Sequence, residues 1–222
     1  MKTTVKLSMV VMIGFTLMLS AGCASTPKYS GFLGDNYKNL QPGPEDGAKM
    51  RWIKPGVMYG RYDKFMVDSV IFFFADDSEY KGIDPNVMKE LADGFNQALV
   101  EAFKDKYPIV AEPGPDVMRI RWAITGIKES KPGLSAVTSI LPVGLAVSAV
   151  KKGAAGSWTG SGATSAEIEI LDSLTNGVIG CAFDEKTAGF TERFSRWGSA
   201  QEAFEFWAGK LVGFIDNTRG MK

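Results

Sequence analysis

Residues 163–184 read Ala163-Thr-Ser-Ala-Glu-Ile-Glu-Ile-Leu-Asp-Ser-Leu-Thr-Asn-Gly-Val-Ile-Gly-Cys-Ala-Phe-Asp184, and this stretch predicts the element around which the fold is built. Its two halves alternate apolar and polar residues, as strands with one buried face do. Asn176-Gly177 between the halves is typical of a hairpin turn. We therefore predict two antiparallel strands with one face on a hydrophobic core and with Glu167 and Glu169 on the other face.

A third strand precedes this hairpin in the sequence. Residues 117–127 also alternate, so that Arg119 and Arg121 share one face and the apolar residues share the other. Two carboxylates on one strand face, Glu167 and Glu169, can perform acid and base catalysis. Opposite charges on neighbouring strands more often pair across the sheet, so we predict ion pairs on a solvent-exposed face and assign no catalytic residue.

Two amphipathic helices are expected to cover at least one face of the sheet. Asp84 and Pro85 are a typical N-cap and first residue for a helix that runs to about Lys104. Ser199 and Glu202 have the spacing of a capping box for a second helix that ends near residue 217. The apolar stripes are Val87, Leu91, Phe95, Leu99 and Phe103 in the first helix, and Ala203, Phe204, Trp207, Leu211, Phe214 and Ile215 in the second.

The remaining extended segments complete a prediction of the fold class. Met66–Phe74 is rich in β-branched and aromatic residues without clean alternation, which favours a central strand covered on both faces. Residues 109–111 are predicted to form a short strand before a turn at 112–116. The order is strand, helix, two strands, an apolar insert, two strands and a helix. This order predicts an α+β sandwich with a sheet of about five strands.

The apolar insert, residues 133–150, contains eighteen consecutive uncharged residues. That length reaches the threshold for a membrane span, but serines, glycines and Pro142 dilute its hydrophobicity, so we do not predict a span. Three alternatives remain open: packing on the sheet, an oligomer interface, or contact with a membrane surface. The candidate contact residues are Leu134, Ile140, Leu141, Leu145 and Val147.

Residues 1–22 have the features of a secretory signal peptide. Lys2 and Lys6 precede a short apolar core, and small residues precede Cys23. A cysteine in this position is typical of bacterial lipoproteins, in which the thiol is diacylated and becomes the new N-terminus. Ser20 stands where leucine is commonest in that motif. We predict lipidation at Cys23.

Residues 23–65 are expected to form an aromatic-rich arm between the lipid and a single domain over residues 66–222. The arm contains many Gly and Pro residues, but its aromatic content is too high for a flexible polar linker. We predict that only residues 24–28 are free and that the following aromatic side chains pack onto the domain.

The composition excludes several function classes. Without residues 1–22, 23 basic residues face 25 acidic ones, a net charge of −2 that indicates no nucleic-acid partner. The chain has no histidine, which excludes histidine-based nucleophiles and metal sites. Cys181 is expected to be a small buried residue, not a reactive thiol. Four acidic residues near turns, Glu112, Asp116, Asp172 and Asp184, lack the spacing of a cation site, and we predict neither a metal nor a cofactor.

Three stretches carry a resemblance to a known family: Tyr29-Ser-Gly-Phe-Leu-Gly-Asp-Asn-Tyr37, Glu112-Pro-Gly-Pro-Asp-Val-Met-Arg-Ile-Arg-Trp-Ala-Ile-Thr125 and Glu167-Ile-Glu-Ile-Leu-Asp-Ser-Leu-Thr-Asn-Gly177. Together they resemble the bacterial lipoproteins grouped as domain of unknown function 3313. The resemblance implies an envelope lipoprotein, and it supplies no catalytic residues. Because Ala24 and Ser25 follow the cysteine, similarity to lipoproteins in general favours the periplasmic face of the outer membrane.

These features predict a lipid-anchored periplasmic module that is not an enzyme and that binds another envelope protein or assembles with itself. One alternative is an enzyme acting on cell wall or glycan through Glu167, Glu169 or Asp172. Another is a carrier of an apolar ligand, which requires a cavity lined by Trp122, Ile140 and Phe183.

Overall fold

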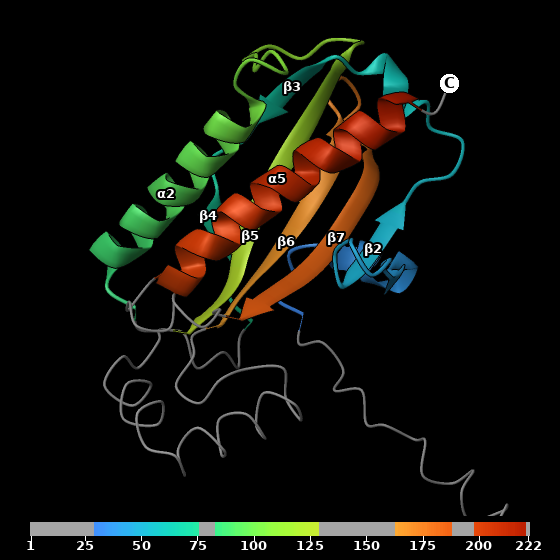
Figure 1. Cartoon of the computed structure of the whole chain (residues 1–222). Coiled ribbons are helices and arrows are strands. Elements are labelled where there is room, and N and C mark those ends of the chain that lie inside the picture. The colour runs from blue at the N-terminus through green and yellow to red at the C-terminus, as the bar shows by residue number, and fades with distance from the viewer. Residues whose placement is uncertain (1–28, 76–82, 129–162, 188–197, 221–222) are drawn as a thin grey trace, which may run out of the picture.

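The computed structural model describes residues 29–75, 83–128, 163–187 and 198–220. In this part of the chain, seven strands form one open mixed sheet, and two long helices pack side by side on one of its faces (Figure 1). The predicted α+β class is confirmed.

The sheet is assembled mainly from long strands of the second half of the chain. The order across the sheet is β1-β2-β7-β6-β5-β3, and β4 also pairs with β5. β3 and β4 run parallel to β5, and the other neighbours are antiparallel. The strands are β1 (Gln41–Pro42), β2 (Met50–Ile53), β3 (Lys64–Val67), β4 (Ile71–Phe72), β5 (Val117–Lys128), β6 (Ala163–Asp172) and β7 (Val178–Thr187).

The predicted hairpin is confirmed as β6 and β7. Asn176 has a φ of 53°, the left-handed conformation that asparagine tolerates in tight turns. β6 also pairs with β5, and the register shifts between Ile124 and Gly126. Before the bulge, the even-numbered residues of β5 face the core. The bulge adds one residue to β5, so that after it the odd-numbered Ile127 faces the core.

Both predicted helices are present. α2 (Pro85–Phe103) begins after Asp84, whose side chain accepts a hydrogen bond from the Asn86 N–H at 2.8 Å. α5 (Gly198–Gly220) begins one residue before Ser199 and extends three residues past Asn217, so the predicted N-cap lies inside the first turn. Two short 3-10 helices, η2 (Gly34–Asn39) and η3 (Tyr59–Arg61), lie in the N-terminal region.

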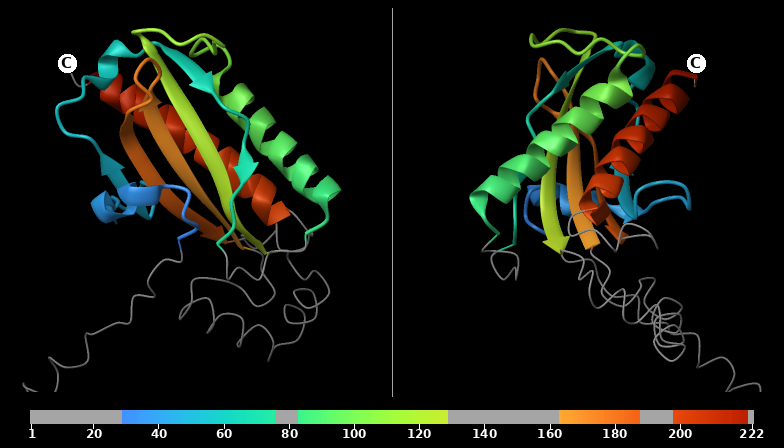
Figure 2. Two further views of the ribbon diagram at one scale, coloured as in Figure 1. Left: turned by 180° about the vertical axis from the view of Figure 1, so that it is seen from behind. Right: turned by 60° about the vertical axis from the view of Figure 1, so that its left-hand side comes forward.

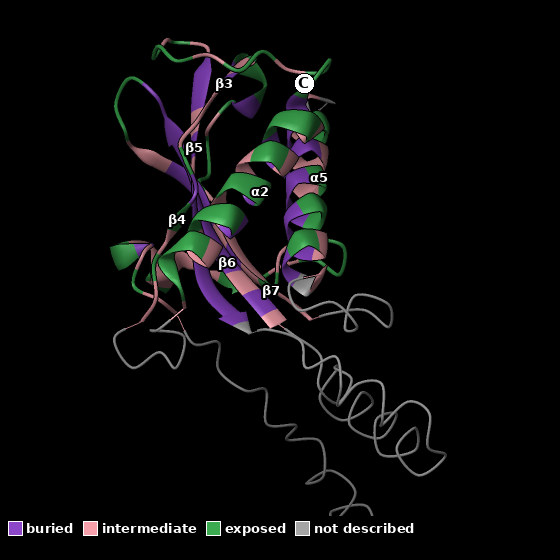
Figure 3. Cartoon of the chain, turned by 90° about the vertical axis from the view of Figure 1, so that its left-hand side faces the viewer, coloured by how far each residue is buried: buried purple, intermediate pink, exposed green. Residues whose placement is uncertain are grey.

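The main core lies between the helices and the sheet, where the purple residues gather in Figure 3. Phe95 of α2 stacks on Phe204 of α5, with ring centroids 4.6 Å apart, and also contacts Trp122 of β5 and Trp207 of α5. Burial of each such aromatic side chain stabilises the fold by roughly 1.5–3 kcal/mol.

Two strand predictions are wrong in part. Met66–Phe74 is not a central strand: it contains the end of β3 and all of β4, which lie at the edge of the sheet, and Ile71 and Phe73 are exposed. Between the two strands, the Asp68 carboxylate pairs with Arg119 and the Val70 N–H bonds the Asn96 side chain. Residues 109–111 form no strand and make a single bridge, from Ile109 to Phe65.

The N-terminal arm contributes to the sheet. β2 pairs with β7, with Met50 opposite Phe183, and β1 pairs with β2. These strands account for most of the difference between seven strands and the predicted five. The predicted boundary at residues 65 and 66 falls inside β3.

Several predictions lie outside the described residues: the signal peptide 1–22, the lipidation site Cys23 and the insert residues Leu134, Ile140, Leu141, Leu145 and Val147. Within the part that the structure describes, neither long helix has the length and apolarity that a membrane crossing needs.

Candidate functional site

The polar face of β5 and β6 is the face of the sheet that carries no helix. Figure 2 shows this side from behind, with the N-terminal arm in blue lying across the strands. Arg121 and Glu169 are register partners, and their side chains form a salt bridge of 2.8 Å. The predicted cross-strand ion pair is therefore confirmed for these two residues.

The other predicted pair does not form. Arg119 lies opposite Leu171, and its guanidinium instead bonds the carboxylate of Asp68 through both Nε and Nη2, at 2.7–3.2 Å. Glu167 lies opposite Ala123, which leaves its carboxylate without an arginine across the strand.

Residues of the arm take the place of that arginine. Glu167 accepts hydrogen bonds from the Ser30 N–H at 3.0 Å, from the Ser30 hydroxyl at 2.9 Å and from the Tyr37 hydroxyl at 2.6 Å. Three donors from the arm therefore converge on this buried carboxyl group. We call Glu167, Ser30 and Tyr37 the arm clasp.

Aromatic contacts surround the arm clasp. The Tyr29 ring stacks on Tyr37 at 4.6 Å and meets the edge of Phe183 at 5.4 Å, while Phe32 contacts Phe73 at 5.8 Å. The predicted packing of the arm's aromatic side chains onto the domain is thus confirmed from residue 29 onward.

The prediction of a solvent-exposed polar face is wrong for Glu167, which the arm covers, and for Glu169, whereas the side chains of Arg119 and Arg121 are 33% and 40% exposed. Glu167 is 0% exposed and Glu169 is 6% exposed. Burial raises the pKa of Glu169, with an opposing effect of the Arg121 charge and a further increase from Glu167. Burial and the hydrogen bond to Glu167 raise the pKa of Tyr37 to about 12, so Tyr37 remains a neutral donor.

A second set of contacts fixes the end of the arm at the β6–β7 turn. Asp172 accepts hydrogen bonds from Tyr62, from Arg61 and from the Thr175 N–H and hydroxyl. Burial alone raises the pKa of Asp172, but these bonds and the Arg61 charge outweigh that effect and lower it. Asp172 therefore connects the arm and the turn.

The other acidic candidates are not brought together. Asp116 pairs with Lys64 at 2.6 Å, and Asp184 accepts hydrogen bonds from the Trp207 Nε1–H at 2.8 Å and the Lys49 N–H at 3.1 Å. Among the described residues, no group of three or more His, Cys, Asp or Glu side chains is placed to hold a metal ion.

Cys181 lies opposite Glu169 in the sheet and is buried, as predicted. Burial, with smaller effects of Glu169 and Glu167, raises the pKa of its thiol to about 12. The thiol is therefore protonated and unreactive at neutral pH.

Two of the residues proposed to line an apolar cavity lie on opposite faces of the sheet. Trp122 contacts Phe95 and Trp207 on the helix side of the sheet, whereas Phe183 contacts Tyr29 on the arm side. Ile140 lies outside the described residues. Trp122 and Phe183 therefore cannot line a single cavity.

Fold and site together define a class: an open-sheet α+β domain whose helix-free face is closed by its own N-terminal segment through buried carboxylates. The chain belongs to the family described as "Protein of unknown function (DUF3313)", which matches residues 28–211. Over 166 residues it is 30% identical to the uncharacterized lipoprotein YdcL of Escherichia coli K12, covering 72% of this chain and 73% of that protein.

Similarity to solved structures is weaker. A PelC dodecamer from Paraburkholderia phytofirmans has a TM-score of 0.42 and 11% identity, covering 74% of this chain and 94% of that one. A protein of Xanthomonas campestris has a TM-score of 0.39 and 12% identity, covering 71% of this chain and 86% of that one.

The sequence alone does not predict that Ser30 and Tyr37 contact Glu167. An alternating strand has the same pattern whether water or another segment of the chain covers its polar face. The available signal was the hydroxyl-rich and aromatic Tyr29–Tyr37 stretch close to the predicted lipidation site.

Proposed function

We propose that the protein is a lipid-anchored module of the bacterial cell envelope that binds another envelope protein or assembles with itself, and that it is not an enzyme. One observation carries the proposal: both carboxylates of the sheet are used structurally, one to hold the arm and the other in an ion pair within the sheet. Glu167 bonds Ser30 and Tyr37, and Glu169 pairs with Arg121.

Anchoring at Cys23 is supported by the signal-like sequence before it and by the lipoprotein relative in Escherichia coli. Ala24 and Ser25 favour the periplasmic face of the outer membrane as the location. Because the arm is fixed from residue 29, the six steps from Cys23 to Tyr29 span at most about 22 Å. The arm clasp would thus hold the domain close to the bilayer.

The same geometry relates the anchor to the apolar insert. β5 ends and β6 begins at one end of the sheet, where Lys128 pairs with Ala163, and Figure 1 shows the described chain starting near that end. Both connections to residues 129–162 are therefore on the anchor side. This position supports contact of Leu134, Ile140, Leu141, Leu145 and Val147 with the membrane surface or with a partner near it.

Metabolic labelling with radioactive palmitate tests the anchor. The full chain should incorporate label and fractionate with outer membranes, whereas Cys23→Ser should do neither. Cys181→Ser is the matched control for loss of a cysteine and should retain the label. An unlabelled full chain would contradict the anchor.

Binding is tested with the chain from Ala24 onward. Size-exclusion chromatography with light scattering, followed by crosslinking in intact cells, should give an oligomer or a defined complex with an envelope protein. A monomer that forms no crosslink in cells would contradict the proposed binding role.

A further inference from the structure

Two hollows lie at the end of the molecule opposite the anchor side. One, of about 460 Å³, is lined by η3 with the preceding Val57 and Met58, and by the last turn of α5. The other, of about 280 Å³, is lined by the start of β3 and by Lys106–Pro108. Arg219 of α5 lines both hollows, so they adjoin at this side chain.

Three of the cationic side chains around these hollows form ion pairs with carboxylates of the same chain. Lys64 bonds Asp116 at 2.6 Å, Arg61 bonds Asp172, and Lys106 lies 3.8 Å from Asp216. Each of these three cations therefore has a carboxylate partner within the fold.

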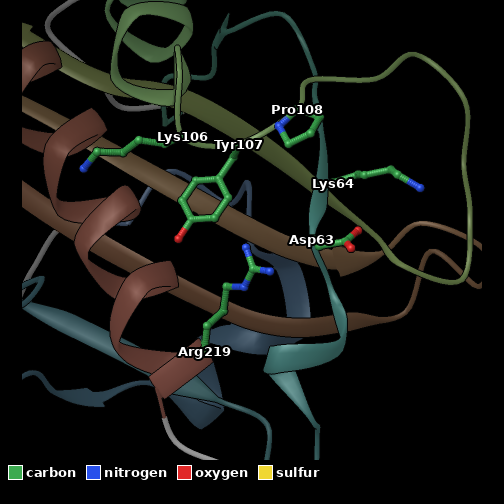
Figure 4. Close-up of a pocket in the computed structure, with 6 residues that line it drawn as sticks. All are labelled: Asp63, Lys64, Lys106, Tyr107, Pro108 and Arg219. Carbon is green, nitrogen blue, oxygen red and sulfur yellow. The ribbon is translucent and has the colours of Figure 1, made fainter.

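Arg219 is different. Its guanidinium lies over the Tyr107 ring, 5.2 Å from the centroid, and Figure 4 shows the two side chains pointing toward each other. The Arg219 guanidinium also hydrogen-bonds the Tyr107 hydroxyl, which itself donates to Asp216, and among the described residues Arg219 makes no direct ion pair with a carboxylate. The N–H groups of Arg219 that do not bond Tyr107 can therefore bind a carboxylate from outside, in the two-pronged geometry that a guanidinium favours.

An exposed apolar side chain adjoins this cation. Met58 is 73% exposed, more than any other large hydrophobic residue in the described part of the chain. Methionine adapts to irregular apolar partners and is common at binding surfaces. Gly60 lies between Met58 and the last turn of α5, where a Cβ would be 3.9 Å from the Arg219 Cα.

We propose that this end of the molecule docks an extended segment of another envelope protein in which an acidic residue adjoins a large apolar one. The carboxylate binds Arg219, and the apolar side chain packs on Met58 and Val57. This inference rests on the proposed binding function and specifies its partner.

Position favours a protein over a lipid as the occupant. β6 has ten residues and is therefore about 33 Å long. Asp172 at its far end bonds Arg61, which lines the larger hollow, while Ala163 marks the end nearer the anchor. The hollows thus face away from the membrane that holds Cys23.

Photocrosslinking in intact cells tests the site. The full chain carries p-benzoylphenylalanine in place of Met58, or in place of Val100, an exposed residue of α2 that serves as the matched control. We expect Met58 to yield an adduct with another envelope protein, mapped by mass spectrometry to a segment containing Asp or Glu. Val100 should not capture that segment.

Arg219 variants test the charge contact in the same cells. Arg219→Ala should reduce the Met58 adduct at least about tenfold, and Arg219→Lys, which keeps the charge but not the two-pronged geometry, should retain only part of it. Thermal melting confirms that both variants fold. An adduct with a second copy of this chain, with phospholipid or with a segment lacking acidic residues would overturn the inference, as would an adduct insensitive to Arg219.

The controls separate this inference from the proposed function. Ile71 of β4, which is also exposed, carries the photocrosslinker as a third position. If Met58 captures nothing while Val100 or Ile71 captures an envelope protein, the docking site is wrong and the binding function stands. If none of the three positions captures a protein, both fail.

Discussion

The Tyr37 hydroxyl donates a hydrogen bond of 2.6 Å to Glu167, a residue 130 positions away in the sequence. The bond joins the arm that follows the predicted lipidation site to a central strand of the sheet. Its acceptor is 0% exposed, so the bond forms away from water. Glu167 therefore acts as a structural anchor for the arm.

Removing this carboxylate should loosen the arm and destabilise the domain. Glu167→Ala leaves Ser30 and Tyr37 without their acceptor, and we expect the free energy of unfolding to fall by about 2–4 kcal/mol. Urea denaturation measures the loss, and limited proteolysis should cleave the variant first near residues 29–40. Glu185→Ala, at an exposed pair with Lys49, should change stability by less than about 0.5 kcal/mol.

High pH should release the arm through ionisation of Tyr37. Its pKa is raised from 10.0 to about 12 in the folded protein. The contribution of the neutral Tyr37 hydroxyl to the free energy of unfolding is fully present below pH 10 and is lost as the pH rises through about 12. Urea midpoints measured from pH 8 to 12 should fall less steeply for Tyr37→Phe than for the unmodified chain. Equal slopes for the two proteins would contradict this assignment.

The aromatic core should respond strongly to truncation. Phe95 is 0% exposed and stacks on Phe204, so Phe95→Ala should cost about 3–5 kcal/mol. Val100→Ala, on the exposed side of the same helix, should stay within about 0.5 kcal/mol. Thermal or urea denaturation compares the two variants, and similar losses would contradict the described packing of α2.

Cys181 should be unreactive in the folded protein. In a Cys23→Ser chain it is the remaining cysteine, and its pKa is raised to about 12. Ellman's reagent at pH 8 should label less than about a tenth of the thiol until urea unfolds the chain. Rapid labelling of the folded chain would show that the arm does not cover this part of the sheet.

The sequence predicted the elements whose burial follows a simple period. β5, β6, β7, α2 and α5 were all expected near their observed bounds, because each alternates or repeats its apolar residues toward one core. Arg121 and Glu169 were also predictable as a pair, since both lie on the polar face of neighbouring strands.

Long-range contacts of irregular segments were not predictable. Met66–Phe74 was interpreted as a central strand because its composition is hydrophobic, but its position at the edge depends on pairing with β5. Likewise, the register between β5 and β6 places Ala123, and not an arginine, opposite Glu167. The hydrogen-bond donors for Glu167 come from the arm, which reaches it only in the folded protein. The hydrogen bonds of the arm join residues more than 100 positions apart, and the pairings of Met66–Phe74 with β5 and of Ala123 with Glu167 join residues more than 40 positions apart, separations that no local pattern encodes.

The central claim is that Glu167 holds the arm on the sheet, and a double-mutant cycle tests it most directly. Urea denaturation of the chain from Ala24 onward gives the unfolding free energies of Tyr37→Phe, Glu167→Ala and the double variant. We predict a coupling energy of about 1–2 kcal/mol between the two positions, because either single change breaks the same bond. Additive effects, with a coupling below about 0.3 kcal/mol, would contradict the claim.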